Sequence, residues 1–495
     1  MVRSGGVQVA AQPRPDPPPK VPHAPGSAPE AFAWQPWAER RGLRCINCQQ
    51  WYPLREIIYR CAKCDDLLDV VYPRPPESPQ TLKRRWHRRR SSDKLIDRSG
   101  VWRFREMLPF YDRESQLVTY PEGNTPLLDA PRSAAYAGVR RLRFKHLGFN
   151  PTGSFKDYGM AAGVTQARIL GMQAVACAST GNTSASMAAY AARAGLVAIV
   201  LVPEGGVSFP KLSQSLDYGA LTLQIRGDFD AAMTLLQEIG PGLGIYILNS
   251  VNPFRLEGQK SVMLELLEQC AWQAPDRIVV PGGNLGNSGS YGKALRELDD
   301  LGLLSKRPHI TIVQARGAAP LYNAFHGGHP ETLERVHHAR TLATAIKIGS
   351  PVSWKKARRA VDWSDGWVTS VDEQDIADAK AIIGADGIGC EPASATTLGA
   401  IRRLAREGTD SRIDPDEDII AILTGNVLKD ADYTLRYHSS ELYEEFTTET
   451  VMTHRGTKLA SRFANPPAVV DATAEALVAA IRARLSDRER GASHQ

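Results

Sequence analysis

The stretch FNPTGSFKDYG, Phe149 to Gly159, decides how the rest of the chain is interpreted. Its proline, glycines and serine are turn formers, and the segment after it, GMAAGVTQARILGM, carries small and apolar residues at helical spacing. We therefore expect Lys156 at the start of a helix. The positive end of the helix dipole disfavours an ammonium group there, and partial burial would lower the lysine pKa further and make the amine a nucleophile. Taken alone, the stretch is more simply explained by a surface lysine.

Apolar runs alternate with helical patterns along most of the chain. The runs AVACAS, VAIVLVP, RIVVPGG, ITIVQA and IIAILTG are typical of buried strands, and each lies next to a segment with helical periodicity. This order predicts parallel sheets that are covered by helices on both faces. No internal repeat is visible.

Two loops that follow such strands have the composition of anion sites. STGNTSASMAAYAARAG begins at Ser179, where the run AVACAS ends, and offers backbone amides and hydroxyl groups at a helix start. An ordinary capped helix is the alternative. GGNLGNSGS begins at Gly282 after RIVVP, and its glycines let successive N–H groups curve around a dianion. This second loop lacks the dinucleotide-binding fingerprint and the lysine of a P-loop, and alone it is a weak signal.

These stretches, together with others further along the chain, resemble the sequence motifs of the threonine synthases and occur in the same order. The threonine synthases are a family of fold-type II enzymes that depend on pyridoxal 5′-phosphate (PLP). The further stretches are NPFRLEGQK from Asn252, ATAIKIGSPVSW from Ala343, GCEPASATTLGA from Gly389 and LTGNVLKD from Leu423. The resemblance implies an α/β fold like that of the tryptophan synthase β subunit. It places two parallel-sheet three-layer domains within residues 116–470, the smaller at about 150–250 and nested in the larger.

The resemblance also assigns residues to the cofactor. Lys156 would hold PLP covalently and, once released, would remove the α proton of the substrate. Asn182 would lie against the ring and bond its 3-oxygen. Thr424 would place a hydroxyl group against the pyridine nitrogen, which favours elimination and replacement over transamination. The loop for the cofactor phosphate would consist of Gly283, Asn284, Leu285, Gly286 and Asn287.

A phosphorylated substrate would bring a second dianion into the same pocket, so cationic groups must offset the repulsion. Arg255 and Lys347 match family positions that face the substrate's phosphate, with Ser179 and Thr183 as neutral donors. Most cations of this kind are surface residues, and that remains the alternative for both.

The implied reaction converts O-phospho-L-homoserine and water to L-threonine and phosphate by β,γ-elimination and replacement. One alternative is a related enzyme of the same fold, such as a cysteate synthase acting on O-phosphoserine or an amino-acid dehydratase or lyase. Another is a non-catalytic zinc-ribbon protein that binds nucleic acid. Three positions depart from the family pattern: Tyr158 replaces the usual arginine, and Asn426 and Val427 replace the histidine and glycine of many relatives.

A doubled CxxC pattern lies near the N-terminus, in CINCQQWYPLREIIYRCAKC. Cys45 and Cys48 form one pair and Cys61 and Cys64 the other, so that two knuckles can complete a tetrahedron around zinc. Four thiolates leave no open coordination position, which favours a structural site over a catalytic one, and a redox-active pair is the other alternative. We expect a zinc ribbon at 39–75, and some threonine synthases carry such a ribbon.

The remaining segments are tails and a basic stretch. Residues 1–38 are rich in proline and poor in apolar groups, which predicts a disordered tail. KRRWHRRRSSDK, Lys83 to Lys94, lies in a basic linker expected at 76–115, where a solvated helix or a dimer contact is favoured over nucleic-acid binding. Residues 471–495 are expected to form a C-terminal helix and tail.

The composition is that of a soluble globular protein, with 43% of the 495 residues hydrophobic and 23% charged. The net charge of +6 could favour anionic ligands but does not demonstrate nucleic-acid binding. No apolar run approaches the length of a membrane span, and the N-terminus lacks the apolar core of a signal peptide. Because the paired cysteines suit a metal site in a reducing compartment, we expect a cytoplasmic protein. We also expect a homodimer that acts on a small phosphorylated amino acid.

Overall fold

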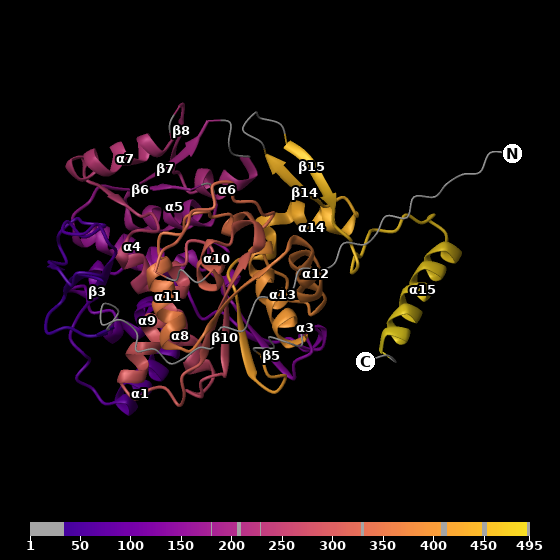
Figure 1. The fold of residues 1–495 in the computed structure, drawn as a ribbon, viewed down its shortest axis with the longest axis horizontal. Helices are drawn as coiled ribbons and strands as arrows, with labels where there is room; N and C mark the ends of the chain where they lie inside the picture. Colours follow the sequence, from indigo (N-terminus) through magenta and orange to yellow (C-terminus); the bar gives the residue numbers. More distant parts are fainter. Residues whose placement is uncertain are drawn as a thin grey trace. The chain divides into compact units, whose positions relative to one another are not determined.

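Two mostly parallel sheets form the framework of residues 36–495 (Figure 1). The computed structural model describes residues 34–179, 181–204, 209–227, 229–327, 331–406, 413–447 and 453–492. The larger sheet has the strand order β12 (Trp367–Val371), β11 (His309–Ala315), β10 (Arg277–Pro281), β13 (Asp418–Leu423), β5 (Arg141–His146) and β4 (Leu127–Asp129). The smaller sheet has the order β8 (Leu221–Ile225), β7 (Val197–Pro203), β6 (Ala174–Ala178) and β9 (Ile245–Ile247).

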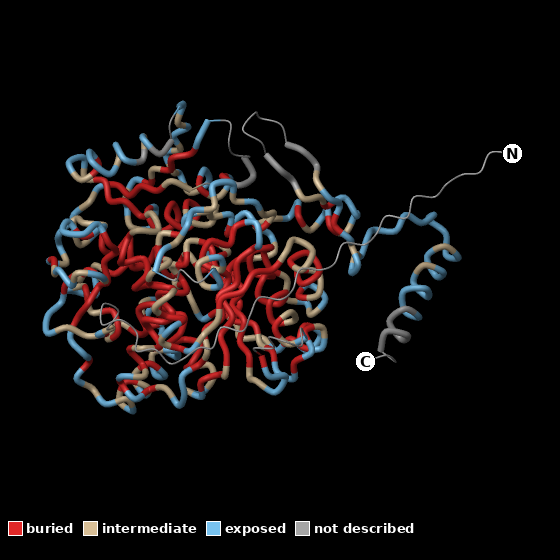
Figure 2. Tube along the Cα trace, viewed as in Figure 1, coloured by how far each residue is buried: buried red, intermediate tan, exposed pale blue. Residues whose placement is uncertain are grey.

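The smaller sheet is inserted in sequence between β5 and β10 of the larger one. β4 pairs with β5 in the antiparallel sense, and the other strand pairs described in the two sheets are parallel. β10 is buried along its whole length, as parallel strands covered on both faces should be. Figure 2 shows buried residues concentrated along the strands of the larger sheet and the helices beside them.

Helices follow the strands as the alternating pattern predicted. They are α3 (Pro131–Ala137), α4 (Lys156–Ile169), α5 (Asn182–Ala194), α6 (Phe209–Asp217), α7 (Phe229–Ile239), α8 (Pro253–Gln269), α9 (Gly286–Asp300), α10 (Pro320–His326), α11 (Trp354–Trp363), α12 (Glu373–Ala385) and α13 (Pro392–Arg406). None of the helices that the structure describes combines the length and the apolar composition needed to span a bilayer.

Helices α4 and α8 pack with their backbones in close contact. A Cβ atom at Gly258 of α8 would overlap the carbonyl oxygen of Tyr158 on α4. A Cβ atom at Gly159 of α4 would lie 3.0 Å from the carbonyl oxygen of Arg255 on α8. Glycine is therefore required on both sides of this contact, because any side chain would push the helices apart. The contact holds Lys156, at the start of α4, and Arg255, at the start of α8, on neighbouring rigid elements.

The segment around the paired cysteines forms a small antiparallel sheet, the ribbon, which packs against α9 and α11. Its strands are β1 (Gly42–Cys45), β2 (Trp51–Tyr52) and β3 (Leu68–Val71), in the order β2-β1-β3. Lys356 of α11 donates to the carbonyl oxygen of Leu68 at 2.7 Å, and Lys293 of α9 donates to that of Val70 at 2.6 Å. The small sheet is thus anchored to α9 and α11 through buried polar contacts.

Asp69 is the charged centre of this docking surface. Its carboxylate lies 2.9 Å from Lys356 Nζ and 2.8 Å from an Arg359 guanidinium nitrogen. Burial opposes ionisation, but Arg359, Lys356 and Lys293 outweigh it and hold the pKa of Asp69 well below its usual range. The carboxylate is therefore ionised and paired at neutral pH.

The basic stretch forms helix α1 (Pro79–Arg90), but the prediction of a solvated linker was only partly correct. Trp86 is buried, and its indole N–H donates to Glu106 Oε2 at 3.0 Å. Arg89 pairs with the same carboxylate at 2.6 Å, and Arg85 pairs with it at 3.0 Å. One face of α1 therefore packs against the segment around η2 (Trp102–Met107), while Arg84, His87 and Arg88 are exposed.

The C-terminal part adds elements that the sequence predicted only in part. Helix α2 (Leu95–Arg98) follows α1 in the chain. After the last strand of the larger sheet, the chain forms α14 (Ala431–His438), a hairpin of β14 (Tyr443–Thr447) and β15 (Thr453–Lys458), and α15 (Ala474–Ala492). The hairpin was not expected, and α15 lies within residues 471–495, for which a helix and tail were expected. Most of the expected N-terminal tail, residues 1–33, lies outside the described residues, and the boundaries proposed for the ribbon, linker and catalytic region stay predictions.

Replacing Asp69 by asparagine should lower the free energy of unfolding by about 3–5 kcal/mol, because it leaves buried cations without their counter-charge. The depressed pKa makes this contribution complete at neutral pH, and it should be lost as the pH falls below about 4 toward the folded-state pKa. Denaturant unfolding as a function of pH measures both effects. Asp65→Asn, in the exposed part of the same ribbon, is the matched control, and an equal loss in both variants would contradict the docking role of Asp69.

Candidate active site

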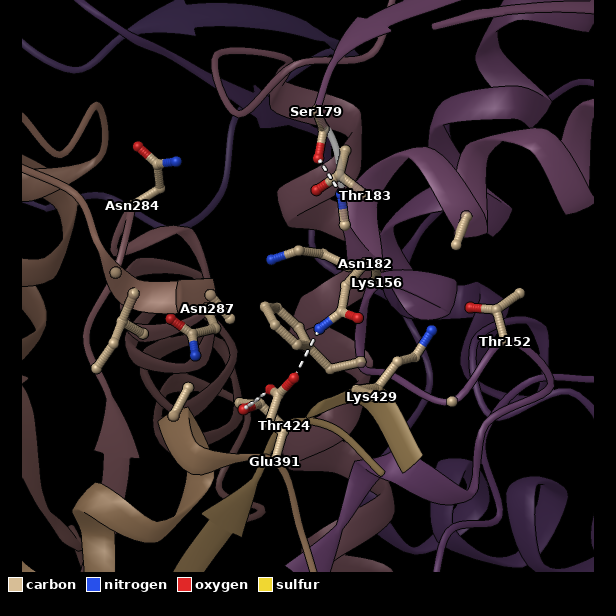
Figure 3. A pocket seen from close by; sticks show the side chains of 18 of the residues that line it. Thr152, Lys156, Ser179, Asn182, Thr183, Asn284, Asn287, Glu391, Thr424 and Lys429 are labelled. Carbon is tan, nitrogen blue, oxygen red and sulfur yellow. Dashed lines mark hydrogen bonds between the residues drawn. The ribbon is translucent and has the colours of Figure 1, made fainter. Parts of the chain in front are cut away.

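A cavity of about 860 Å³ opens where strands of both sheets end (Figure 3). The start of α4, the start of α5, the loop after β10 and the end of β13 contribute to its lining. The sequence-predicted residues that line it are Lys156, Ser179, Asn182, Thr183, Arg255, Gly283, Asn284, Leu285, Gly286, Asn287 and Thr424. Stretches that are far apart in the chain therefore meet around one space. In Figure 3, Asn284 and Asn287 lie on one side of it and Asn182 and Thr183 on the other.

Lys156 is the first residue of α4, as its sequence context predicted. Its ammonium nitrogen lies 3.8 Å from the centre of the Phe155 ring. Burial, and after it the positive charge of Arg255, lower the pKa of Lys156 to about 7, although the negative charge of Glu391 acts in the opposite direction. A substantial fraction of the side chain is therefore a neutral amine near pH 7, which is the form that acts as nucleophile and base.

The loop from Gly283 to Asn287 presents backbone amides to the cavity. Leu285 has a φ of +63°, in the left-handed region, and it provides no side-chain cap to α9. Within the described residues, none of the backbone N–H groups from Gly283 to Asn287 has a hydrogen-bond acceptor. Free amides at the start of a helix favour an anion, because the helix dipole adds to the hydrogen bonds.

A buried carboxylate, Glu391, joins the two sides of the cavity. Its Oε2 accepts a hydrogen bond from Asn182 Nδ2 at 2.9 Å, and its Oε1 accepts one from Thr424 Oγ1 at 2.7 Å (Figure 3). Ser394 accepts hydrogen bonds from the amides of Thr424 and Gly425, which leaves its own proton for Thr424 Oγ1 at 3.0 Å. The two polar groups predicted to face the cofactor ring are thus held by one carboxylate.

Glu391 and Lys429 are cavity residues that the sequence analysis did not assign. Glu391 lies in the quoted stretch GCEPASATTLGA, and the available signal was an acidic residue directly before the proline that begins α13. Lys429 lies in LTGNVLKD, and its ammonium group donates to Gln214 Oε1. Burial lowers the pKa of Lys429, against the attraction of Glu391, Asp157 and Asp430.

Arg255 is a buried cation at the cavity wall. It is 2% exposed, and one guanidinium nitrogen donates to the carbonyl oxygen of Leu248 at 2.8 Å. Its Nε has no hydrogen-bond partner, and no carboxylate of the described residues forms an ion pair with it. Burial lowers the pKa of Arg255 to about 10, which leaves the group charged at neutral pH. An unpaired, desolvated guanidinium is a strong attractor of anions.

The other residues predicted to bind the substrate differ in whether they line the cavity. Ser179 follows β6, and its hydroxyl accepts from the amide of Gly181 at 3.3 Å. Thr183 is the second residue of α5 and is partly exposed to the cavity. Lys347 is exposed and is not part of the lining, although Ile346 and Ile348 on either side of it are. Its role toward a substrate stays a prediction.

The four paired cysteines converge on one point. Their sulfur atoms all lie within 4.8 Å of one another, and the pairs Cys45–Cys64 and Cys48–Cys61 are each 3.4 Å apart. Sulfur atoms about 2.3 Å from a tetrahedral zinc ion lie about 3.8 Å from each other, so the cluster matches such a site in size. None of the cysteines in the described residues forms a disulfide.

Comparison with known proteins agrees with this geometry. The family model described as pyridoxal-phosphate dependent enzyme matches residues 118–425. A threonine synthase of Methanocaldococcus jannaschii is 43% identical over 395 residues, which cover 79% of this chain and 94% of that protein.

The chain belongs to the threonine synthase family of PLP-dependent enzymes.

More distant members and neighbours agree. Threonine synthase 2, chloroplastic, of Arabidopsis thaliana is 36% identical over 438 residues, covering 85% of this chain and 80% of that protein. The crystal structure of threonine synthase from Escherichia coli superposes with a TM-score of 0.58 at 17% identity, covering 79% of this chain and 90% of that one. The structure of maize serine racemase has a TM-score of 0.52 at 21% identity, covering 61% and 88%. The two structures show the shared fold.

The cavity of this threonine synthase family member fits PLP. Its amine of lowered pKa is positioned for an aldehyde, and the orphaned amides from Gly283 to Asn287 are suited to a phosphate. A Cβ atom at Gly283 would lie 3.2 Å from Ile346 Cγ2 and 3.3 Å from the carbonyl oxygen of Ala345, so the loop needs glycine to keep its shape. Asn182 keeps a second amide N–H for a ring oxygen, and the Thr424 hydroxyl lines the cavity with its proton directed to Glu391.

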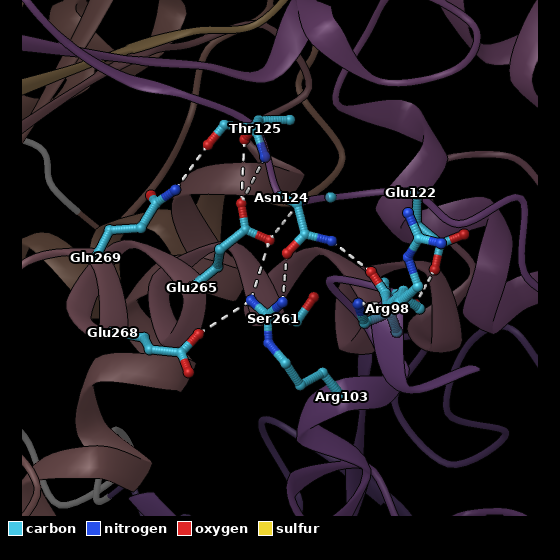
Figure 4. A network of polar contacts seen from close by, with 12 residues as sticks. Arg98, Arg103, Glu122, Asn124, Thr125, Ser261, Glu265, Glu268 and Gln269 are labelled. Carbon is cyan, nitrogen blue, oxygen red and sulfur yellow. Dashed lines mark hydrogen bonds and ion pairs between the residues drawn. The ribbon is translucent and has the colours of Figure 1, made fainter. Parts of the chain in front are cut away.

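Tyr158, where the threonine synthases usually have arginine, points away from the cavity. It is buried, and its hydroxyl donates to Glu265 Oε1 at 3.2 Å. Figure 4 shows the surrounding network, in which Arg103 pairs with Glu268 at 3.1 Å and lies 3.7 Å from Glu265. Lys145 also pairs with Glu265. Cations from other elements therefore already balance the carboxylates at this position.

The other two departures lie on different surfaces. Asn426 lines the catalytic cavity, and its Oδ1 caps η8 (Val427–Asp430) by accepting from the amide of Leu428 at 3.0 Å. Val427 lines a separate cavity, where its side chain packs against Gly389. Of the three changes, only Asn426 alters the wall of the catalytic cavity.

In cofactor-free protein, modification of Lys156 by an amine-specific acylating reagent should reach half its maximal rate near pH 7, because only the neutral amine reacts. Arg255→Gln removes the neighbouring positive charge and should move this midpoint to higher pH. Peptide mass spectrometry of the segment around Lys156 follows the modification, with Lys156→Ala as the blank. A midpoint of about 10, the ordinary range for lysine, would contradict the depressed pKa.

Proposed function

We propose that the chain is a threonine synthase that converts O-phospho-L-homoserine and water to L-threonine and phosphate, with PLP as cofactor. The observation that carries the proposal is the pairing of Lys156 with two separate anion sites in one cavity. The free amides from Gly283 to Asn287 form the first, and the unpaired guanidinium of Arg255 forms the second. A phosphorylated cofactor and a phosphorylated substrate need two such sites.

The cofactor would be held by Lys156, by the amides from Gly283 to Asn287, and by Asn182 and Thr424 on the polar atoms of its ring. When bound, PLP withdraws electrons from the α carbon of the amino acid and stabilises the carbanion formed there. Glu391 fixes the direction of the Asn182 amide and the Thr424 hydroxyl through its two oxygens. It therefore acts as a positioning residue for both ring contacts.

Lys156 would act as the base for the substrate. Its pKa of about 7 matches neutral pH, so the amine can both accept the α proton and give it up again. One proton would then move in net from the β carbon to the γ carbon, where it completes the methyl group, while the γ carbon–oxygen bond breaks and phosphate leaves. Water would give its hydroxyl group to the β carbon and its remaining proton to the released phosphate.

Arg255 would bind the phosphate of the substrate, with Ser179 and Thr183 as neutral donors. Its charge is already desolvated and lacks a carboxylate partner, so no ion pair has to be broken to bind the anion. Lys347 would be a further contact to this phosphate, because its neighbours Ile346 and Ile348 line the cavity. The homodimer and the cytoplasmic location also stay proposals.

We further propose that Cys45, Cys48, Cys61 and Cys64 bind one structural zinc ion. The convergence of the sulfur atoms supports this, and four thiolates leave no position open for a substrate. The metal would stabilise the ribbon, which is too small to have a large core of its own.

The direct test is turnover of O-phospho-L-homoserine by the purified holoenzyme, compared with O-phospho-L-serine. Threonine and phosphate should appear in equal amounts from the first substrate, and Lys156→Ala should be inactive because it lacks both the cofactor attachment and the base. Preference for O-phospho-L-serine would identify a different enzyme of the same fold. Near-normal turnover by Lys156→Ala would remove the mechanism.

Arg255→Ala should raise KM for the phosphorylated substrate by about tenfold or more, which corresponds to loss of a charge-assisted contact of ~1.5–3 kcal/mol. The visible absorbance of the bound cofactor should remain, because its phosphate has a separate loop. Loss of the cofactor with intact substrate binding would show that the two phosphate sites are reversed. Lys347→Ala in the same assay measures whether that exposed side chain reaches the substrate.

The purified protein should contain about one zinc ion per chain, as a closed four-thiolate site requires. Cys45→Ser should lower the midpoint of thermal unfolding more than it lowers kcat of the protein that is still folded. Cys270→Ser, outside the cluster, should keep its zinc and serves as the control. Metal-free protein with unchanged stability would disprove the assignment.

A further inference from the structure

A second cavity, of about 540 Å³, lies beside α12 and α14, and we name it the Lys380 cavity. Its lining consists of Arg132, Ala377, Lys380, Ala381, Ile382, Gly384, Ala385, Gly389, Val427, Thr434, Tyr437, His438, Phe463, Ala464, Asn465 and Arg484. These residues include lysine, arginine and histidine but no aspartate or glutamate. A bound anion would therefore find cations and no carboxylate among the lining residues, because the nearby carboxylates of Asp378 and Asp386 lie behind the wall and accept hydrogen bonds from Tyr437 and from the amide of Arg132.

Lys380 is the buried cation of this cavity. It is 6% exposed, and its ammonium group donates to Thr434 Oγ1 at 2.8 Å. Within the described residues no carboxylate forms an ion pair with it, and Asp430 acts on it only from a longer distance. Burial lowers the pKa of Lys380, against the attraction of Cys390 and Asp430. A buried ammonium with a single hydroxyl partner has lost hydration that the protein does not replace.

Further polar and apolar groups surround this ammonium. His438 Nδ1 accepts a hydrogen bond from the amide of Asn465 at 2.8 Å, which makes the other ring nitrogen a donor. Arg132 lines the same space from α3. Ala377, Ala381 and Phe463 supply apolar surface. The cavity thus offers donors and a small apolar wall, but no acidic group that could receive an ammonium.

We propose that the Lys380 cavity is a second binding site, for a small organic anion that carries one or two carboxylate groups and no positively charged amino group. The buried cation needs a counter-charge, and the apolar wall accommodates a short carbon chain. A zwitterionic amino acid is disfavoured, because nothing in the lining would balance its ammonium. The inference does not depend on the proposed reaction, because it concerns residues outside the catalytic cavity.

The two cavities share a wall. Gly389 and Val427 line the Lys380 cavity, while Glu391 and Lys429, two residues further along each segment, line the catalytic cavity. Gly389 has a φ of +65°, and its carbonyl oxygen lies 2.8 Å from His146 Nε2. The amide of Glu391 donates to the carbonyl oxygen of Gly425 at 3.1 Å. An anion in the second site would therefore contact the backbone that positions Glu391.

Calorimetric titration of the holoenzyme with malonate tests the site. Wild-type protein should bind malonate, and Lys380→Met should weaken the affinity by about tenfold or more, as loss of a charge-assisted hydrogen bond requires. Lys94→Met removes an exposed lysine elsewhere and should leave the affinity unchanged. Arg255→Ala should leave the Lys380-dependent part of the binding unchanged, which separates this site from any binding of malonate in the catalytic cavity. Threonine, as the zwitterionic probe, should not compete.

Several outcomes would overturn the proposal. Equal malonate binding by wild type and Lys380→Met would do so, as would loss of binding in Arg255→Ala with retention in Lys380→Met. The thermal midpoint of each variant without ligand shows whether it is folded. Because the methionine side chain needs no counter-charge, Lys380→Met should be at least as stable as wild type in malonate-free buffer, and malonate should raise the midpoint of wild type and of Lys94→Met but not that of Lys380→Met. If Lys380→Met does not fold, Arg132→Gln replaces it, and an unchanged affinity there would count against the site.

Discussion

The carboxylate of Glu391 is the contact on which the arrangement of the catalytic cavity depends. It accepts from Asn182, at the start of α5 beside the smaller sheet, and from Thr424, at the end of β13 in the larger sheet. The two donors reach the same group from different sheets, so the carboxylate fixes the distance between them. Gly425 is needed for this, because a Cβ atom there would overlap the Glu391 carboxylate. The side chains of Asn182 and Thr424, which are proposed to face the cofactor ring, are thereby held in place before any ligand enters.

Two desolvated cations give the cavity its chemistry, and they act on each other. Arg255 lowers the pKa of Lys156, and its own side chain lacks a carboxylate partner in the described part of the chain. An anion bound at Arg255 would offset that charge and so raise the proton affinity of the amine. If Arg255 binds the phosphate of the substrate and Lys156 removes its proton, as proposed, the two events would be linked through electrostatics without any movement of the chain.

Local sequence patterns predicted the features that depend on neighbouring residues. The turn formers before Lys156 placed it at a helix start, the apolar runs gave the strands, and the CxxC spacing gave the cysteine cluster. Features that depend on distant residues could not be predicted in this way. Asn182 and Glu391 are 209 positions apart, and Asp69 and Arg359 are 290 apart, so no window of sequence contains both partners. The unpaired state of Lys380 and the exposed position of Lys347 likewise depend on packing.

The glycine contact between α4 and α8 has a consequence for substrate selection. Lys156 is the first residue of α4 and Arg255 is the third residue of α8, and the two backbones approach closely at Gly159 and Gly258. The positions from which the two side chains start are therefore set by main-chain packing, and only side-chain rotation is left to place the amine and the guanidinium. If the two residues bind a substrate as proposed, backbones that cannot slide past each other would favour amino acids whose anionic end group lies within a narrow range of distances from the α carbon.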